Sequence, residues 1–86
     1  MRCLLLYDIV DDNKRQKIAD VCLDYGLDRV QYSVFFGNIS RNLQEEMFQQ
    51  VQRILGKGDG RLLLIPINQT NWQERLSYER TGYGEL

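Results

Sequence analysis

Residues 3–12 read Cys3-Leu4-Leu5-Leu6-Tyr7-Asp8-Ile9-Val10-Asp11-Asp12, and the rest of the architecture can be worked out from this segment. The pattern predicts an apolar β-strand over residues 2–9, followed at once by the acidic start of a helix. The strand carries one carboxylate, Asp8, and an ionised side chain is almost never buried without a partner. Asp8 therefore caps the next helix, pairs with a cation or binds a metal.

The composition indicates one small globular domain with 86 residues, a net charge of −1, 43% hydrophobic residues and 27% charged residues. A core of this size is only marginally sufficient, so a partner is expected to complete it. The longest apolar runs, residues 3–7 and 62–67, have the length of strands. We therefore expect no membrane association and a cytoplasmic protein.

The cysteine and histidine content limits which metal sites, disulfides and general bases the protein can have. The chain has two cysteines, Cys3 and Cys22, and no histidine. This argues against a structural zinc site and favours two buried thiols over a disulfide. Because no imidazole is present, a general base would have to be a carboxylate, a tyrosine, a lysine or a metal-bound water.

Hydrophobic periodicity predicts the elements that follow the first strand. They are a helix from Asp11 or Asp12 to Gly26, a β region over residues 28–39, a helix after Ser40 and a strand over residues 61–67. The β region is one bent strand or a tight hairpin, since residues 31–33 contain no Gly, Pro or Asn to mark a turn. Residues 76–80 are a candidate last strand. We expect a single domain over residues 1–80 and a C-terminal tail over residues 81–86.

The strands over residues 2–9 and 61–67 offer apolar side chains to both faces of the sheet. Two helices can cover only one of these faces. In a chain this short, the economical cover for the other face is a second copy, packed sheet to sheet across a two-fold axis. The sequence therefore predicts a homodimer.

Two separated motifs carry a family pattern. They are Tyr7-Asp8-Ile9-Val10-Asp11-Asp12, with Arg15 after it, and Tyr25-Gly26-Leu27-Asp28-Arg29-Val30-Gln31-Tyr32-Ser33-Val34-Phe35-Phe36-Gly37. In order and spacing from residue 2 to about residue 67, the chain resembles the CRISPR-associated protein two family. The resemblance implies an α+β fold, a ferredoxin-like βαββαβ sandwich, with a hairpin inside residues 28–39. It also implies a homodimer packed through the open face of the sheet.

The resemblance also implies a function. Members of this family are described as magnesium-dependent endonucleases that act on single-stranded RNA or on double-stranded DNA. They also bridge two dimers of the CRISPR integrase subunit when new spacers are inserted, a step in antiviral defence. Two alternatives remain open: a non-catalytic scaffold that clamps DNA in the integrase complex, and a toxin ribonuclease of the virulence-associated protein D type.

Asp8 matches the family aspartate taken as the catalytic metal ligand. This role suits Mg²⁺, which prefers oxygen ligands, keeps several waters and needs only one or two carboxylates. A two-fold dimer would bring two copies of Asp8 together. The alternative is that Asp8 caps the helix or pairs with an arginine, while capping is the favoured role for Asp11 and Asp12.

Arg15 and Arg29 match basic positions of the family motif, and we expect both to contact the nucleic-acid backbone. Their alternative is an ordinary solvated charge or an ion pair with Asp28 or Glu45. Cations near a helix N-terminus oppose the macrodipole, and phosphate binding would offset that cost. For two further cations in the same turn an ordinary solvated charge is the favoured interpretation; they are Lys14 and Lys17.

Phe35 matches a family aromatic near the active cleft, and its direction depends on whether residues 28–39 form a hairpin. We consider it for nucleic-acid binding by base stacking, with packing in the dimer as the alternative. Ser33 is a possible accessory residue that would donate a hydrogen bond to phosphate or to metal-bound water. A role in a turn is at least as well supported for Ser33.

Overall fold

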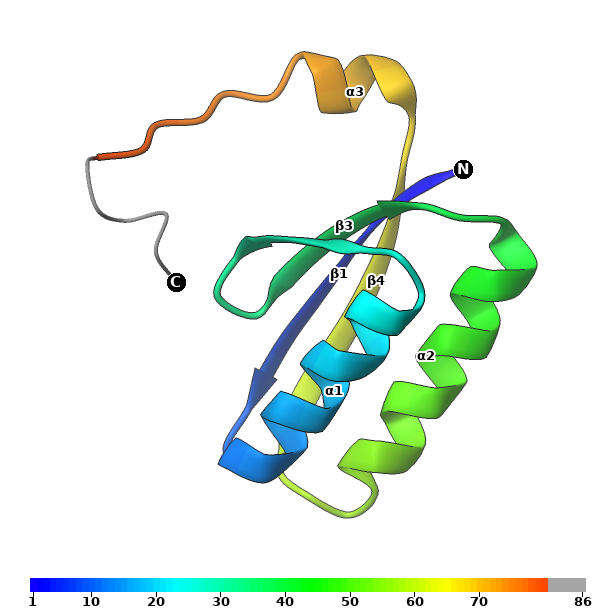
Figure 1. The fold of residues 1–86 in the computed structure, drawn as a ribbon, viewed down its shortest axis with the longest axis vertical. Coiled ribbons are helices and arrows are strands. Elements are labelled where there is room, and N and C mark those ends of the chain that lie inside the picture. Colours follow the sequence, from blue (N-terminus) through cyan, green and yellow to red (C-terminus); the bar gives the residue numbers. More distant parts are fainter. Residues whose placement is uncertain (81–86) are drawn as a thin grey trace.

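The computed structural model of the protein describes residues 1–80, so the predicted tail over residues 81–86 lies outside the described residues. The elements follow one another along the chain as Figure 1 shows. They are β1 (Arg2–Ile9), α1 (Asp12–Asp24), β2 (Asp28–Gln31), β3 (Val34–Asn38), α2 (Arg41–Leu55), β4 (Gly60–Ile67) and α3 (Gln69–Gln73).

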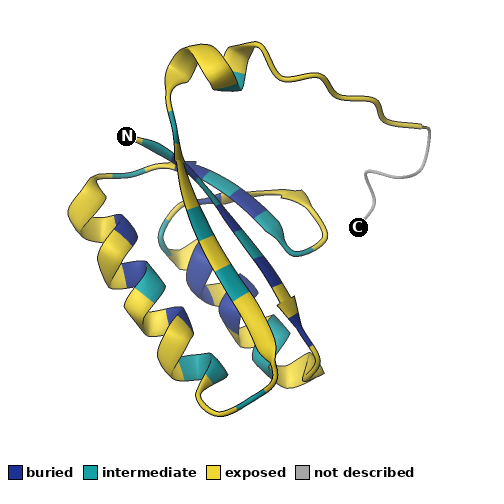
Figure 2. Ribbon diagram, turned by 180° about the vertical axis from the view of Figure 1, so that it is seen from behind, coloured by how far each residue is buried: buried dark blue, intermediate teal, exposed yellow. Residues whose placement is uncertain are grey.

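The strands form one sheet in the order β2-β3-β1-β4, and each neighbouring pair is antiparallel. Helices α1 and α2 lie side by side across the same face of this sheet (Figure 1). The arrangement confirms the predicted α+β class and the ferredoxin-like βαββαβ order. Within residues 1–80, the opposite face of the sheet has no helical layer over most of its length (Figure 2).

The β region over residues 28–39 is a hairpin. Gln31 of β2 faces Val34 of β3, so Tyr32 and Ser33 form the connecting turn. Ser33 has a φ of 65°, in the left-handed region that non-glycine residues usually avoid. The turn carried no glycine signal because a serine adopts the conformation that glycine would normally supply.

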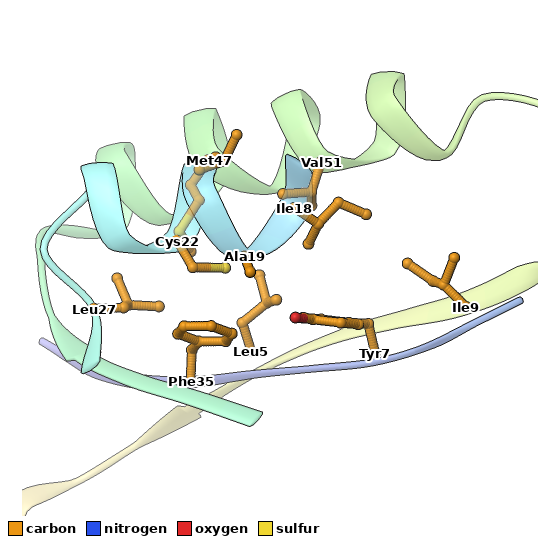
Figure 3. Packing of buried hydrophobic residues seen from close by; sticks show 11 residues of the cluster. Leu5, Tyr7, Ile9, Ile18, Ala19, Cys22, Leu27, Phe35, Met47 and Val51 are labelled. Atoms are coloured by element: carbon orange, nitrogen blue, oxygen red, sulfur yellow. The ribbon is translucent and has the colours of Figure 1, made fainter. Parts of the chain in front are cut away.

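The core lies between the sheet and the two long helices. On β1 the residues that point toward the helices are at most 8% exposed; they are Cys3, Leu5, Tyr7 and Ile9. Figure 3 shows most of the core side chains converging between the two layers. Helix α1 contributes Ile18 and Cys22 to this core, and α2 contributes Met47 and Val51. Both cysteines are buried and free, as predicted.

The open face of the sheet is apolar, as the sequence predicted. Leu4 of β1 faces Ile65 of β4, and Leu6 faces Leu63. Leu63 is 48% exposed and Ile65 is 42% exposed. Large side chains that would normally be buried thus border solvent over the central strands.

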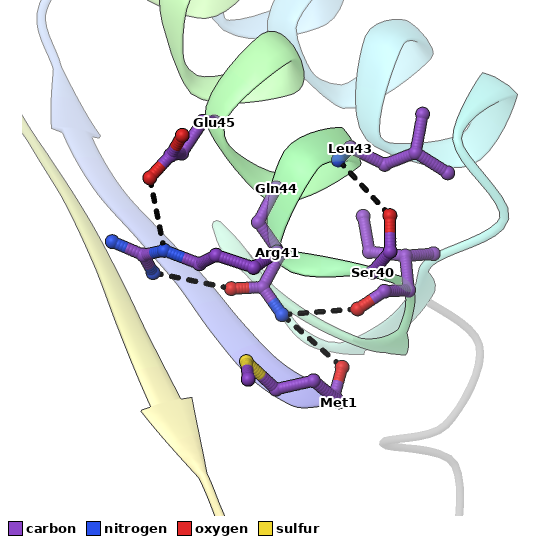
Figure 4. Close-up of polar contacts among 7 residues, drawn as sticks. Met1, Ser40, Arg41, Leu43, Gln44 and Glu45 are labelled. Carbon is purple, nitrogen blue, oxygen red and sulfur yellow. Dashed lines mark hydrogen bonds and ion pairs between the residues drawn. The ribbon is translucent and has the colours of Figure 1, made fainter.

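A buried glutamine joins the start of β1 to the start of α2 (Figure 4). The Nε2 atom of Gln44 donates to the backbone oxygens of Met1 and Ile39, each at 3.1 Å. Its Oε1 atom accepts from Arg41 at 3.3 Å. Ser40 caps α2 through a hydrogen bond from the backbone N–H of Leu43 at 3.2 Å, which confirms the predicted helix start.

After β4, α3 contacts the open face through Trp72. The ring of Trp72 in α3 stacks on Phe36 with centroids 3.7 Å apart, and Arg75 lies over Trp72 at 4.0 Å. Residues 76–80 form no strand, so that prediction is wrong: Leu76 is 98% exposed and no strand of the described chain lies beside it to pair with. Within residues 1–80, no helix has the length and apolarity needed to cross a bilayer.

Candidate functional site

Asp8 lies near the end of β1 and points to the open face of the sheet. Its neighbours Tyr7 and Ile9 are buried on the helix side, whereas Asp8 is exposed. The residue opposite it on β4 is Arg61, which is also exposed. Both border a shallow depression of about 140 Å³ that Leu63 also lines.

Two of the three explanations for Asp8 do not hold within one chain. Asp11 is the N-cap of α1, because its Oδ1 accepts a hydrogen bond from the backbone N–H of Lys14 at 2.9 Å. In the part of the chain that the structure describes, the Asp8 carboxylate forms no ion pair, even with Arg61 beside it. Its carboxylate is therefore available to an external ligand.

As a metal ligand, Asp8 can fill one position of a site but not several. Among residues 1–80, no three His, Cys, Asp or Glu side chains gather in a group that would hold a metal ion. Mg²⁺ is bound in many proteins by one or two carboxylates together with waters. The exposed and unpaired carboxylate of Asp8 fits a Mg²⁺ site of this kind. Residues 1–80 do not by themselves form a complete set of metal ligands.

Arg15 holds the segment between β1 and α1. Its Nη1 donates to the backbone oxygen of Ile9 at 2.8 Å and to that of Val10 at 3.4 Å. Its Nη2 forms an ion pair with the carboxylate of Asp12, one turn earlier on α1. The partner of Arg15 is thus neither Asp28 nor Glu45, because two residues three apart on a helix lie next to each other on its surface.

Arg29 lies on β2, where it faces Phe35 of β3 in the register. Its guanidinium carbon is 5.0 Å from the centroid of the Phe35 ring, a cation–π distance. The hairpin carries Arg29 toward the N-terminal part of α1. As a result, Arg29 and Arg15 line the same pocket, a cavity of about 340 Å³ at the edge of the sheet.

Ser33 forms a corner of this pocket and also serves as a turn residue. Its backbone oxygen accepts a hydrogen bond from the backbone N–H of Tyr7 at 3.1 Å, which ties the hairpin to β1. Burial raises the pKa of the Tyr7 phenol, while Arg29 and a hydrogen bond with Ser33 lower it in part. The Tyr7 hydroxyl is therefore neutral at pH 7 and is a hydrogen-bonding group of the pocket wall.

Phe35 does not lie on a nucleic-acid surface. Its ring is 0% exposed and packs among the core side chains, 6.2 Å from the ring of Tyr7 (Figure 3). The prediction that Phe35 stacks on a base is therefore wrong, and so is dimer packing, because both need an accessible ring. The hairpin turn explains the error, since it sets the alternation of β3 so that Phe36, and not Phe35, reaches the open face.

The structure separates the predicted site residues into two groups. Arg15, Arg29 and Ser33 line one pocket on the helix side of the sheet edge. Asp8 belongs to a different depression on the open face. Consecutive side chains on a strand point to opposite faces, so Tyr7 contributes to the wall of the first pocket and the Asp8 side chain cannot.

Lys14 has a structural role that the sequence did not indicate. Its Nζ donates to the backbone oxygen of Leu55 at 2.7 Å, at the C-terminal end of α2. A cation is favourable at that end of a helix because the last carbonyl groups carry partial negative charge. The favoured interpretation of Lys14 as an ordinary solvated charge is therefore wrong. No local signal could have shown this, since the two residues lie 41 positions apart.

Arg61 and Tyr32 also line these sites, and neither is predicted from the sequence as a site residue. Arg61 lies opposite Asp8 only because β1 and β4 pair in one register. Tyr32 lines the pocket because the chain reverses direction at this residue. Strand alternation would have placed Arg61 on a face, but it could not have identified the neighbour across the sheet.

Comparison with known proteins gives a family match. The model of the family described as "CRISPR associated protein Cas2" matches residues 1–75. A "CRISPR-associated endoribonuclease Cas2" from Desulforudis audaxviator is 48% identical over 67 residues, which cover 78% of this chain and 63% of that relative, less than two thirds of its length. A "CRISPR-associated endoribonuclease Cas2 2" from Chloroflexus aurantiacus is 41% identical over 80 residues, or 93% of this chain and 94% of the relative.

Two solved structures share the fold. A hypothetical protein from Thermus thermophilus is 34% identical, with a TM-score of 0.70 over 78% of this chain and 80% of that one. The Cas2 protein of Streptococcus pyogenes has a TM-score of 0.78 over 93% of this chain and 100% of that one. At 24% identity, this second likeness shows the fold alone.

Proposed function

The chain belongs to the CRISPR-associated Cas2 family, and on that premise we propose that it is a Mg²⁺-dependent endonuclease that cleaves phosphodiester bonds in single-stranded RNA or duplex DNA. The observation that carries this proposal is Asp8, an exposed carboxylate at a strand end that neither caps a helix nor forms an ion pair within the described residues. The names of the Desulforudis and Chloroflexus relatives, both endoribonucleases, support the same reaction class.

Three charged side chains of the two sites have distinct parts in this reaction. Asp8 would hold the metal, which would supply Lewis-acid polarisation of a phosphodiester oxygen and activation of a water. Arg15 and Arg29 bind backbone phosphate and position the strand. The chain has no histidine, so no imidazole is available to take the proton from the attacking water.

We also propose that the active form is a homodimer packed through the open face. Leu63 and Ile65 are nearly half exposed there. Burying this apolar surface in an interface would stabilise a dimer, because the surface is removed from water. Asp8 lies on the same face as these side chains. A two-fold dimer on this face would add a second Asp8 and supply the second carboxylate that one chain lacks.

Cleavage assays with Asp8→Asn test the nuclease proposal. The purified protein is incubated with single-stranded RNA or with duplex DNA, in Mg²⁺ or in chelator. We expect the wild type to cleave only with Mg²⁺, and Asp8→Asn to lose at least about a hundredfold in rate, because an amide oxygen carries no charge for the metal.

Asp24→Asn is the matched control, since it removes an exposed carboxylate at the far end of α1. It should cleave as the wild type does. Equal cleavage by Asp8→Asn and the wild type would contradict the proposal and point to a different site or to contamination.

A second function is favoured by the C-terminal segment. Leu76 and Tyr78 are 98% and 87% exposed on a stretch that leaves the body of the molecule. We propose that this stretch docks on the integrase subunit, so that the dimer bridges two integrase dimers and clamps duplex DNA during spacer acquisition in the cytoplasm. This function is compatible with a nuclease, and it does not require one.

Spacer acquisition in cells separates the two functions. A chain truncated before residue 77 should lose assembly with the integrase and acquire few spacers. Asp8→Asn should acquire spacers normally if bridging is the essential function. Loss of acquisition in Asp8→Asn, together with normal acquisition by the truncated chain, would contradict the scaffold.

A further inference from the structure

The pocket between α1 and the hairpin combines cations with neutral hydrogen-bonding groups. Arg15 enters it from α1 and Arg29 from β2. The phenol of Tyr7 and the hydroxyl of Ser33 add neutral groups. The pocket has one carboxylate among its lining residues, Asp12. The net charge of these lining residues is therefore positive and favours an anion, whereas the negative charge of Asp12 repels it.

Arg15 is held in place from the strand side. The backbone oxygens of Ile9 and Val10 both accept from its Nη1, and its side chain is 26% exposed. Within residues 1–80, the partner of its Nη2 is Asp12. Because backbone carbonyls fix the guanidinium, Arg15 can exchange the partner of Nη2 without moving.

Asp12 is suited to being displaced. Its side chain is 84% exposed, so its pair with Arg15 is a surface ion pair of the kind that contributes little to stability. Asp11 already caps α1, so the helix start does not depend on Asp12. An incoming anion can take its place at Nη2 while the Asp12 carboxylate rotates into water.

The hairpin turn gives an independent sign of a ligand site. Ser33 adopts a φ of 65° in the wall of this pocket, and non-glycine residues in such conformations cluster at ligand and active sites. The turn also carries Tyr32, whose ring is 58% exposed at the pocket. Both residues of the strained turn therefore line the pocket together with residues of α1.

We propose that this pocket binds a phosphate group of a nucleic-acid strand and that Asp12 is an internal competitor, which the phosphate displaces from Nη2 of Arg15. The inference rests on the proposed nucleic-acid function, and it adds a discrete phosphate site whose affinity Asp12 lowers. In the bound state Arg15 and Arg29 contact the phosphate from two sides. Charge-assisted contacts of this kind are the strong hydrogen bonds of phosphate recognition.

Asp12→Asn and Asp24→Asn form a matched pair for the test, because each removes one negative charge from an exposed position on α1. The binding of a fluorescent single-stranded RNA is measured by anisotropy in chelator, where metal-dependent cleavage does not occur. We expect Asp12→Asn to bind about two- to fivefold tighter than Asp24→Asn, the range that an exposed ion pair supports. Equal affinities would overturn the role of Asp12.

Inorganic phosphate tests the pocket itself. In an NMR titration of the wild type, phosphate should shift the backbone amide signals of Arg15 and Ser33 more than those of residues in α2. Arg29→Gln should weaken this shift and reduce the salt slope of RNA binding by about 0.7, the value for one phosphate contact on a single strand. Amide signals that do not respond to phosphate would overturn the site.

The results separate this inference from the nuclease proposal. Cleavage that is insensitive to Asp8→Asn contradicts the nuclease alone, because the phosphate measurements contain no metal. Tighter binding by Asp12→Asn then still supports the pocket. Conversely, equal binding by Asp12→Asn and Asp24→Asn, beside Asp8-dependent cleavage, contradicts the pocket alone.

Discussion

Both faces of β1 are largely apolar, but helices cover only one of them within the described chain. On the helix side, Leu5 and Tyr7 are at most 8% exposed and are covered by α1 and α2. On the open side, Leu6 faces Leu63, which remains 48% exposed. One chain thus covers one face of the sheet with helices and leaves apolar side chains of the other face exposed.

This difference shows where stability and function lie. Residues of the helix side satisfy one another within the chain, as the buried Gln44 does through its three hydrogen bonds. The open side carries Asp8, which has no partner in residues 1–80. A substitution on the first side should therefore act on folding, and one on the second side on assembly and catalysis.

The sharpest test of this difference uses two neighbouring phenylalanines of β3. Phe35→Ala empties a fully buried position and should lower the free energy of unfolding by about 3–5 kcal/mol. Phe36→Ala removes a half-buried ring from the open face, where it contacts Trp72, and should cost clearly less. Urea denaturation of both variants measures the free energy of unfolding. Equal losses would show that the ring of Phe36 contributes as much to stability as the buried ring of Phe35.

The next largest effect is expected on assembly. The double variant Leu63→Lys, Ile65→Lys places two charges on the open face and should weaken dimerisation by about a hundredfold, because apolar contact is lost and cations must be desolvated. Leu23→Lys is the control, since Leu23 is 51% exposed on α1. Analytical ultracentrifugation measures the dimer in each. A dimer that survives on the open-face variant would exclude that face as the interface.

Alkaline pH should lower the free energy of unfolding through the buried thiol of Cys22 on the helix side. Burial raises the pKa of the Cys22 thiol from 9.0 to about 12, so the folded protein keeps this proton while the unfolded chain loses it. The stability is therefore complete below about pH 9 and falls as the pH rises toward 12, by up to about 1.4 kcal/mol per pH unit for this thiol. Urea denaturation at several pH values measures the slope. Cys22→Ala should be less steep than the wild type, and an unchanged slope would contradict the assignment.

The smallest effect concerns the contact between the two helices. Lys14→Met removes the ammonium group that binds the backbone oxygen of Leu55 and should cost about 0.3–1 kcal/mol. Lys17→Met removes the same charge from an exposed position of α1 and should cost less. Thermal unfolding of both variants at low salt measures the difference. Equal losses would show that Lys14 acts through net charge and not through the α2 end.

The sequence was sufficient for the two-faced strand β1, the two long helices, β4 and the cap of α2, whereas the residues alone left open whether residues 28–39 form one strand or a hairpin. These features depend on local patterns, such as the alternation along β1 and the serine before α2, and local patterns survive whatever the rest of the chain does. The exposed position of Asp8 follows from the same alternation. The family motif added Arg15 and Arg29, which the structure brings into one pocket.

The rest depended on which distant segments meet. The turn at Ser33 reversed the expected environment of Phe35, and the register of β4 placed Arg61 beside Asp8. Residues 76–80 were a candidate last strand but pair with no strand of the described chain. Strand pairing, register and the conformation of this turn depend on how distant segments pack. The alternation of polar and apolar residues along one strand does not determine them.

Asp8 shows both kinds of information in one residue. Alternation along an apolar strand determines from the sequence that its carboxylate leaves the face that Tyr7 occupies. Only the tertiary structure decides that Arg61 of β4 lies opposite Asp8 and that the Asp8 carboxylate is still left without a partner in residues 1–80. The reason is physical: the direction of a side chain is set by its own backbone, whereas its partners are set by every segment that packs nearby.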